Sequence, residues 1–291
     1  CFGSDSHSSH WNVTITDESA DGKGILSVSA EDNSRLVGIN IANGKLILEK
    51  GTIHVENTST SQSSSSTAVM VSGNSEFVQT DGIIEVLSAA NAYAVHVSAN
   101  AKADINKADI TATTTGGSTA YGVFAEGNTT IGDANITAAS STTNAVGVYS
   151  TGTTVINNAI VTALPGTTNG YAVSAVQGTC TLNGGKFSAK FPSAKVDVNQ
   201  TDGELIVNGG YFVFLKDLQG YVSEDYTVYD VDANDAAYSE GFRFFVDSFD
   251  AGIDVAKIND TSYPTLKEAL SAANSGDTVI LTNNCRLSDN V

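Results

Sequence analysis

The chain is 291 residues long, 41% of its residues are hydrophobic, and its formal net charge is −18 with only 14 Lys and Arg. This acidic balance argues against DNA or RNA as a partner, because phosphate binding requires a basic surface. No apolar stretch approaches the length of a membrane-spanning helix, so we expect no transmembrane segment.

Residues 1–10 are polar and predict an N-terminal tether. Cys1, followed closely by Gly3 and Ser4, resembles the start of a mature bacterial lipoprotein, and this resemblance implies that Cys1 carries a lipid. The alternative is that Cys1 is only a boundary within a longer chain, since no signal peptide precedes it. The three cysteines are too few and too scattered for a zinc site or a disulfide framework, and Cys180, within strand-like sequence, predicts a buried thiol.

A short apolar motif then recurs along the chain. Its clearest copies are Tyr93–Val97, Tyr121–Ala125, Val146–Ser150 and Tyr171–Ala175. Including weaker copies, the central residues are Ile39, Val69, Val95, Val123, Val148, Val173 and Val196, so the steps are 30, 26, 28, 25, 25 and 23 residues. A near-constant period in this range predicts a solenoid in which each repeat is one coil. The long first step contains a Ser-rich insertion at 57–66, which predicts a polar loop.

Each repeat contains three apolar runs of three to five residues that alternate with period two and favour Val, Ile and Thr. Gly, Asn, Asp and Ser separate the runs, as expected for turns. Three strands and three turns in about 25 residues form one coil of a right-handed parallel β-helix. We therefore predict an all-β protein whose β-helix covers residues 11–213 and begins weakly at 11–15 and 25–28.

Stacking of the coils predicts which side chains share a face. The column of central residues should line the interior, with Tyr93 and Tyr121 pointing the same way near a corner. The residues before it are small (Gly38, Ala68, Ala94, Gly122, Gly147 and Ala172), and those after it are variable, as on a solvent face (Asn40, Met70, His96, Phe124, Tyr149, Ser174 and Asp197).

The composition changes after residue 213, because twelve of the 22 aromatic residues lie between Tyr211 and Tyr263. Solenoids need atypical terminal units that cover their open ends. We therefore interpret residues 214–254 as an aromatic-rich cap or linker, and keep a sugar-binding aromatic patch as the alternative.

Residues 255–291 predict a different structure. Apolar residues at 266, 269, 270 and 273 lie on one face of a predicted helix at 264–275, which Thr265 and Glu268 cap and Gly276 ends. A strand follows at 277–281. The sequence Tyr263-Pro-Thr-Leu-Lys-Glu-Ala-Leu270, followed by Gly276-Asp-Thr-Val-Ile-Leu281, resembles the entry segment of pectin-lyase-like β-helix domains in adhesin-like bacterial surface proteins. The resemblance covers about thirty residues and implies that a further module starts here. The helix is then expected to pack on residues 211–249, on another copy of the chain, or on missing residues, and we favour the last two.

Candidate catalytic residues are sparse. Glycoside hydrolysis requires two carboxylates at one bond, and pectate lyases, which share the resembled fold, use acidic calcium ligands with a base. Asp104, Asp109 and Asp133, with His96 and Lys107 nearby, are candidates, but the next coil has Thr130 and Asn135 in place of Asp104 and Asp109, so turn roles explain the Asp residues more simply. The four His residues are dispersed. We expect no catalytic residues, no metal site and no cofactor.

The stronger candidate is a ligand-binding ridge on the variable column, formed by Met70, His96, Phe124 and Tyr149. Beside the small column it would border a shallow groove along the solenoid, suited to extended glycans that stack on aromatic rings. The competing interpretation is that a neighbouring loop covers these side chains.

Together these features predict a non-enzymatic, adhesin-like or structural protein, secreted or on a bacterial cell surface. Its expected partners are glycan, a host surface or neighbouring subunits, the last through self-association or an adjacent module at the C-terminal segment. The alternatives are a polysaccharide-active lyase or glycoside hydrolase of the same fold, and a self-assembling filament or spacer subunit.

Overall fold

The computed structural model describes residues 11–19, 24–31, 35–59, 65–166, 169–190, 195–248, 256–263 and 266–282. The protein is all-β, with 57% of the described residues in strands. The N-terminal tether, Cys1, Cys285, Thr265 and residues 60–64 of the Ser-rich insertion lie outside the described residues.

Three sheets, here named A, B and C, make up the body of the molecule, and the chain visits them in the repeating order B, C, A. Sheet A contains β3 (Leu36–Ile41), β6 (Ser66–Val71), β9 (Ala92–Val97), β12 (Ala120–Ala125), β15 (Ala145–Ser150), β18 (Gly170–Ala175) and β21 (Val198–Gln200). Sheet B contains β1 (Trp11–Ile15), β4 (Gly44–Leu48), β7 (Glu76–Gln79), β10 (Lys102–Ile105), β13 (Asn128–Ile131), β16 (Thr153–Ile156), β19 (Thr179–Leu182) and β22 (Glu204–Val207). Sheet C contains β2 (Ile25–Ala30), β5 (Thr52–Asn57), β8 (Ile83–Ser88), β11 (Ala108–Thr114), β14 (Ala134–Ser140), β17 (Ala159–Leu164), β20 (Gly185–Ala189), β23 (Gly210–Phe212), β25 (Phe244–Ser248) and β24 (Tyr226–Asp230).

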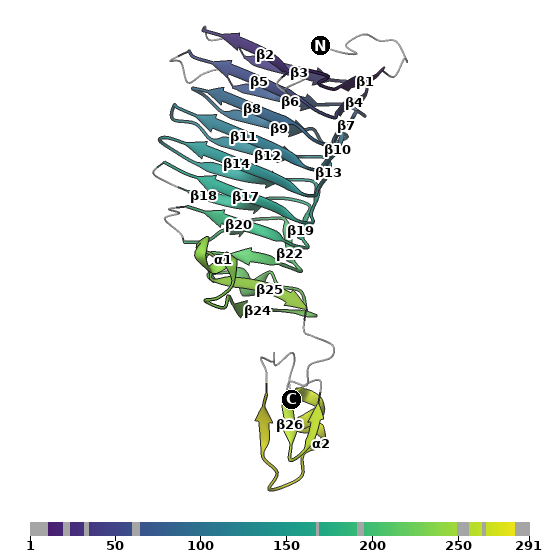
Figure 1. Cartoon of the computed structure of the whole chain (residues 1–291), viewed down its shortest axis with the longest axis vertical. Coiled ribbons are helices and arrows are strands. Elements are labelled where there is room, and N and C mark those ends of the chain that lie inside the picture. The colour runs from purple at the N-terminus through teal and green to yellow at the C-terminus, as the bar shows by residue number, and fades with distance from the viewer. Residues whose placement is uncertain are drawn as a thin grey trace.

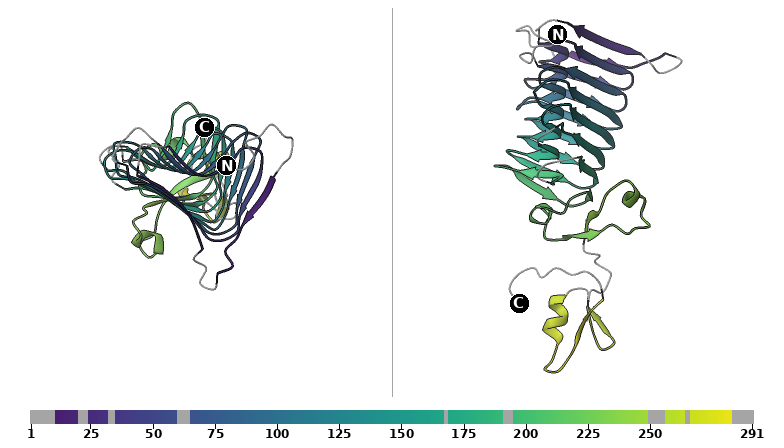
Figure 2. Two further views of the ribbon diagram at one scale, coloured as in Figure 1. Left: turned by 90° about the horizontal axis from the view of Figure 1, so that it is seen from above. Right: turned by 90° about the vertical axis from the view of Figure 1, so that its left-hand side faces the viewer.

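The predicted β-helix is confirmed. Each strand pairs in parallel with the strand one coil later, giving about seven turns (Figure 1). Seen from the end, the coils superpose into a single outline (Figure 2). The fold is consistent with the right-handed form that parallel strand connections favour.

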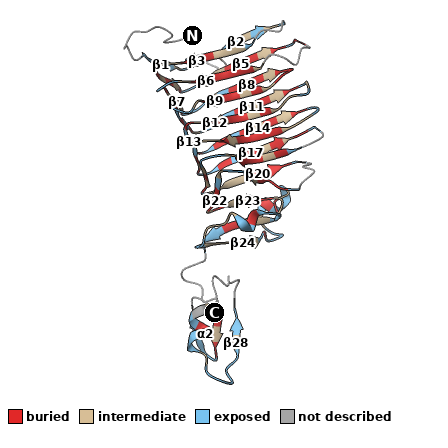
Figure 3. Cartoon of the chain, turned by 180° about the vertical axis from the view of Figure 1, so that it is seen from behind, coloured by how far each residue is buried: buried red, intermediate tan, exposed pale blue. Residues whose placement is uncertain are grey.

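The interior is a set of stacked apolar columns. Val95, Val123, Val148 and Val173 are each fully buried and lie in one register, as predicted. Figure 3 shows the buried residues running through the whole stack. The turns are stacked as well: the side-chain amide of Asn183 donates to Oδ1 of Asn157 at 3.1 Å, and that of Asn208 donates to Asn183 at 3.1 Å. Such amide ladders reinforce in-register stacking.

Cys180 points into this core from β19 and is fully buried, as predicted. Burial raises the pKa of its thiol to about 12, so the reactive thiolate is scarce near neutral pH. In a chain carrying Cys1→Ser and Cys285→Ser, we expect the remaining thiol to react with Ellman's reagent only after denaturation. Rapid labelling of the native protein would instead show that sheet B opens readily.

The last copy of the repeat lies two residues away from its predicted register. Val173 pairs with Val198, so Val198 and not Val196 continues the central column. Asn199, not Asp197, therefore follows Ser174 on the outer column. The Asp197 side chain is buried instead, and its carboxylate accepts backbone N–H bonds from Ala189 (2.8 Å), Val213 (2.7 Å) and Phe214 (2.8 Å).

An aromatic-rich cap closes the C-terminal end of the β-helix, as predicted. β23 pairs antiparallel with β25, which pairs antiparallel with β24, so sheet C ends in two reversed strands. A 3₁₀ turn (Leu218–Gly220) and α1 (Ala236–Ser239) complete this region. Leu218 and Val246 are buried against the last coil. The core is therefore covered at this end.

The C-terminal unit, residues 256–263 and 266–282, corrects part of the prediction. The helix exists as α2 (Leu266–Ala272) and the strand as β28 (Val279–Leu281). However, two strands that the sequence did not reveal, β26 (Ala256–Ile258) and β27 (Thr261–Tyr263), complete an antiparallel sheet with β28. The helix packs on this sheet through the fully buried Ala269. The helix therefore has a partner that the sequence analysis did not name, the sheet of its own unit, while Leu270 on the same helix is 38% exposed.

Candidate binding surface

The alternation of side chains breaks at the same place in β6, β9, β12, β15 and β18 of sheet A. In β12, Gly122 and Val123 are both buried, so their neighbours Tyr121 and Phe124 both face outward. A Cβ on Gly122 would lie 2.4 Å from Cγ2 of Ile136 in the core, which shows that position 122 points inward.

This break corrects two predictions. The column of small residues lines the interior, so no groove runs beside it on the surface; Ala68, Ala94 and Ala172 are each fully buried. Tyr93 and Tyr121 face outward instead of into the core, although Val97 and Ala125 are buried as expected.

The predicted ridge itself is aligned. Met70, His96, Phe124 and Tyr149 occupy successive positions of one register on β6, β9, β12 and β15, and each is partly exposed. The structure brings all four together, and adds Tyr93 and Tyr121, which the sequence analysis missed as site residues. The sequence did contain a sign of this: in both repeats a Tyr stands directly before the small residue of the motif, Ala94 or Gly122.

These side chains form two ladders of rings, which we call the aromatic surface (Tyr93, His96, Tyr121, Phe124 and Tyr149). One pair in each ladder is nearly parallel: Tyr93 and Tyr121 are 5.0 Å apart at 7°, and Phe124 and Tyr149 are 4.7 Å apart at 10°. His96, at the start of the second ladder, instead meets Phe124 at 72°. Between the ladders, Phe124 is nearly perpendicular to both tyrosines, at 88° to Tyr121 and 86° to Tyr93, whereas His96 stacks on Tyr93 at 27°. The arrangement resembles the herringbone packing that aromatic quadrupoles favour.

The phenol groups of the first ladder are fixed and neutral. The side-chain amide of Asn91 donates to Oη of Tyr93 at 3.3 Å. Burial raises the pKa of Tyr93 and of Tyr121 above the ordinary value. Both tyrosines therefore present uncharged, polar-tipped rings at physiological pH.

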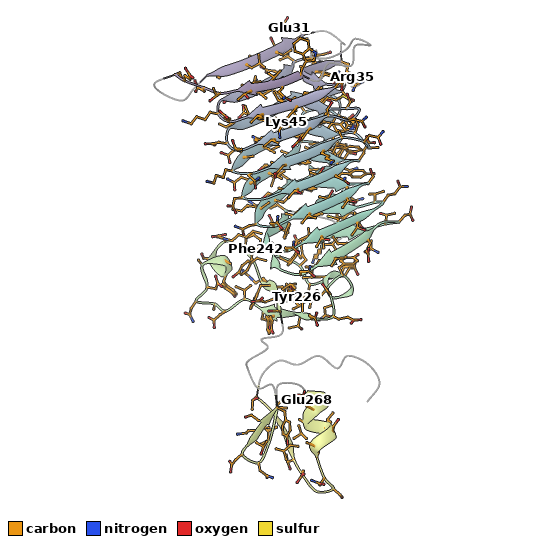
Figure 4. All side chains as sticks on the ribbon, turned by 90° about the vertical axis from the view of Figure 1, so that its right-hand side faces the viewer. Glu31, Arg35, Lys45, Tyr226, Phe242 and Glu268 are labelled. Carbon is orange, nitrogen blue, oxygen red and sulfur yellow. The ribbon has the colours of Figure 1, made fainter. Side chains whose placement is uncertain are left out.

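Charged groups border the aromatic surface. Nη2 of Arg35 lies 3.6 Å from Sδ of Met70 at the N-terminal end (Figure 4). Nε2 of His96 lies 3.1 Å from a carboxylate oxygen of Glu126, whose side chain is 40% exposed. An aromatic centre with a polar border is the usual composition of a binding surface.

The second ladder ends at Tyr149, because the next residue in the register is the small, buried Ser174. Phe124 stacks on one face of Tyr149, and no ring of the described residues stacks on the other face. Among the described residues, Tyr149 contacts the rings of Phe124 and Tyr121 only. Tyr149 is therefore the ring best placed to accept a stacking ligand.

The three Asp residues that were candidates for catalysis lie apart, and each accepts a hydrogen bond from the side chain of a different Asn. Asp104 accepts a bond from Asn106 (2.8 Å) on sheet B, and Asp109 accepts one from Asn135 (2.8 Å) on sheet C. Asp133 lies in a turn and accepts from the side chain of Asn158 at 2.7 Å. His96 belongs to sheet A, so the structure does not assemble these groups into one site.

Lys107 is exposed in the turn before β11, where it takes a positive φ of 46°. In the described parts of the chain, no three His, Cys, Asp or Glu side chains are grouped as a metal ion would require. The described helices include none that is long and apolar enough to span a membrane.

Comparison of the chain with protein-family models, with curated proteins and with solved structures gave no match.

Proposed function

We propose that this chain is a non-enzymatic, adhesin-like β-helix, secreted or displayed on a bacterial cell surface, whose aromatic surface binds glycan. The observation that carries the proposal is the cluster of five outward rings on sheet A, bordered by Arg35 and Glu126. Partly exposed aromatic clusters of this kind on a rigid scaffold are characteristic of binding sites.

The chemistry of the cluster favours sugar over other ligands. Sugar rings present C–H groups that pack on aromatic faces, and hydroxyls that bond to polar groups beside them. The free side of Tyr149 supplies the face, while Asn199, two coils along the same column, supplies an amide that also bonds Ser174 at 3.3 Å. The ligand position is thus the C-terminal end of the second ladder.

The first test is a glycan array probed with the full chain, followed by titration of the best glycan. We expect Tyr149→Ala to weaken binding about tenfold or more, because it removes the stacking face. Ile160→Ala is the matched control: Ile160 is 45% exposed on the outer face of sheet C, away from the aromatic surface. Equal glycan affinity of the Tyr149→Ala variant and wild type would contradict the proposal.

Phe124→Ala is a less direct probe. Phe124 contacts four rings, Tyr93, His96, Tyr121 and Tyr149, so its removal also disturbs the ladders. We expect this variant to lose binding and about 1–2 kcal/mol of stability. A turnover assay with acidic and neutral polysaccharides, with and without calcium, separates binding from catalysis, and cleavage of any of them would contradict the non-enzymatic assignment.

A further inference from the structure

Among the described residues, no cap covers the N-terminal coil of the β-helix, whereas the C-terminal end is capped. β1, β2 and β3 are the terminal strands of their sheets and pair on one side only in the described part of the chain (Figure 1). Leu26 of β2 lies in register with Ile53, yet Leu26 is 42% exposed and Ile53 is fully buried. On sheet B of the same coil, Trp11 lies in register with the buried Gly44, yet Trp11 is 58% exposed. The first coil therefore presents core side chains and free strand edges.

The C-terminal unit also leaves apolar side chains exposed. Among its described residues, only Ala256 and Ala269 are fully buried and Ile258 is 6% exposed, whereas Leu270, Ile280 and Leu281 are 38%, 46% and 56% exposed. Its sheet has the order β27-β26-β28, so within the described residues β28 pairs on one side only. A unit of fewer than about 40 residues rarely buries enough apolar surface to be stable without further contacts. This unit needs a surface to pack on.

The open coil of the same chain is a poor candidate because of distance. Eight residue steps separate Ser248, the end of β25, from Ala256, and they span at most about 28 Å when fully extended. From β25 to β2 there are eight strand spacings in sheet C, or about 38 Å at the usual separation of paired strands. The start of the C-terminal unit therefore cannot reach the open coil of its own chain, whereas a second copy has no such limit.

We propose that the C-terminal unit of one copy packs on the N-terminal coil of a second copy, with β28 meeting the free edge of the first coil. Free strand edges with exposed apolar residues pair readily with other strands. The contact joins two different surfaces, so it is heterologous and adds copies head to tail without closing. It uses neither ladder of the aromatic surface, and so extends the function proposed above without depending on it.

The test is sedimentation velocity of the full chain over a wide concentration range. We expect wild type to grow beyond a dimer as concentration rises. Leu26→Lys blocks one end and Ile280→Lys blocks the other, so each variant alone should associate at least about tenfold more weakly. Trp11→Lys is a second N-terminal variant, at a more exposed position of the first coil, in case Leu26→Lys reduces folding. Ile160→Lys, on the side of the solenoid, is the matched control and should assemble like wild type.

A mixture of the two blocked variants gives the most direct test. An equimolar mixture of the Leu26→Lys and Ile280→Lys variants retains one intact junction per pair, so it should form dimers and nothing larger. A wild type that stays monomeric throughout would overturn the proposal. So would an Ile280→Lys variant that still dimerises, because the contact would then join two N-terminal ends, or a mixture that remains monomeric although both variants are folded by circular dichroism.

Discussion

Val148→Asp is expected to lower the free energy of unfolding by about 4 kcal/mol, enough to leave much of the chain unfolded. Val148 is fully buried in the central column of sheet A, between Val123 and Val173. A carboxylate at this position has no cation or N–H donor to replace its water, and the stacked coils leave it no path to solvent. Denaturant unfolding followed by circular dichroism measures the loss.

The control is a Val→Asp substitution at a nearby position that faces the solvent instead of the core. Val155 lies on β16 and is partly exposed, pointing outward from sheet B. Val155→Asp should cost less than about 1 kcal/mol, because the carboxylate remains hydrated. If both variants lose the same stability, the effect comes from strand propensity and not from burial.

The β-helix and its central column could be predicted because in-register parallel stacking turns a sequence repeat directly into a column of side chains. Val95, Val123, Val148 and Val173 recur at 28, 25 and 25 residues, and any parallel coil of that length superposes them. No other knowledge of the chain was needed for this step.

The faces of Tyr93 and Tyr121 could not be predicted in the same way. Strict alternation would place a residue two positions before a buried Val in the core, but the strand bends where two consecutive residues, such as Gly122 and Val123, face inward. A glycine fits either face, so the sequence alone does not reveal the bend. The predicted groove is absent because the small residues face inward at this bend, whereas the predicted ridge of Met70, His96, Phe124 and Tyr149 lies on the surface as expected.

Two other differences have local causes. Val196 and Val198 offer two registers that look alike in hydrophobicity, and the hydrogen bonds of Asp197 accompany the one adopted. Strands β26 and β27 are three residues long, too short for periodicity to be seen. The only local signal of their hairpin was Asn259-Asp260, where Asn259 takes a positive φ of 53°.

Asp197→Ala is the second substitution from which we expect a large effect. The Asp197 carboxylate accepts three backbone N–H bonds, from Ala189 in the last full coil and from Val213 and Phe214 where the cap begins. Each buried N–H left without an acceptor costs about 1–3 kcal/mol, partly offset by removing a buried charge. The expected net loss at pH 7 is about 3 kcal/mol of unfolding free energy. Asp202→Ala, at an exposed position five residues later, is the control and should change stability little.

The pH dependence of this loss distinguishes a buried acid from a simple packing residue. Burial raises the pKa of the Asp197 carboxyl from 3.8 to about 6 in the folded protein. Between these values the folded state binds the proton more tightly than the unfolded chain, so wild type gains stability from Asp197 as pH falls from about 7 to 4. The Ala variant has no carboxyl and gains nothing from this source. The difference in unfolding free energy between wild type and Asp197→Ala should therefore be roughly 1 kcal/mol larger at pH 5 than at pH 7. A difference that instead shrinks toward pH 5 would mean that the three N–H donors hold Asp197 as an anion and outweigh the cost of burying its charge.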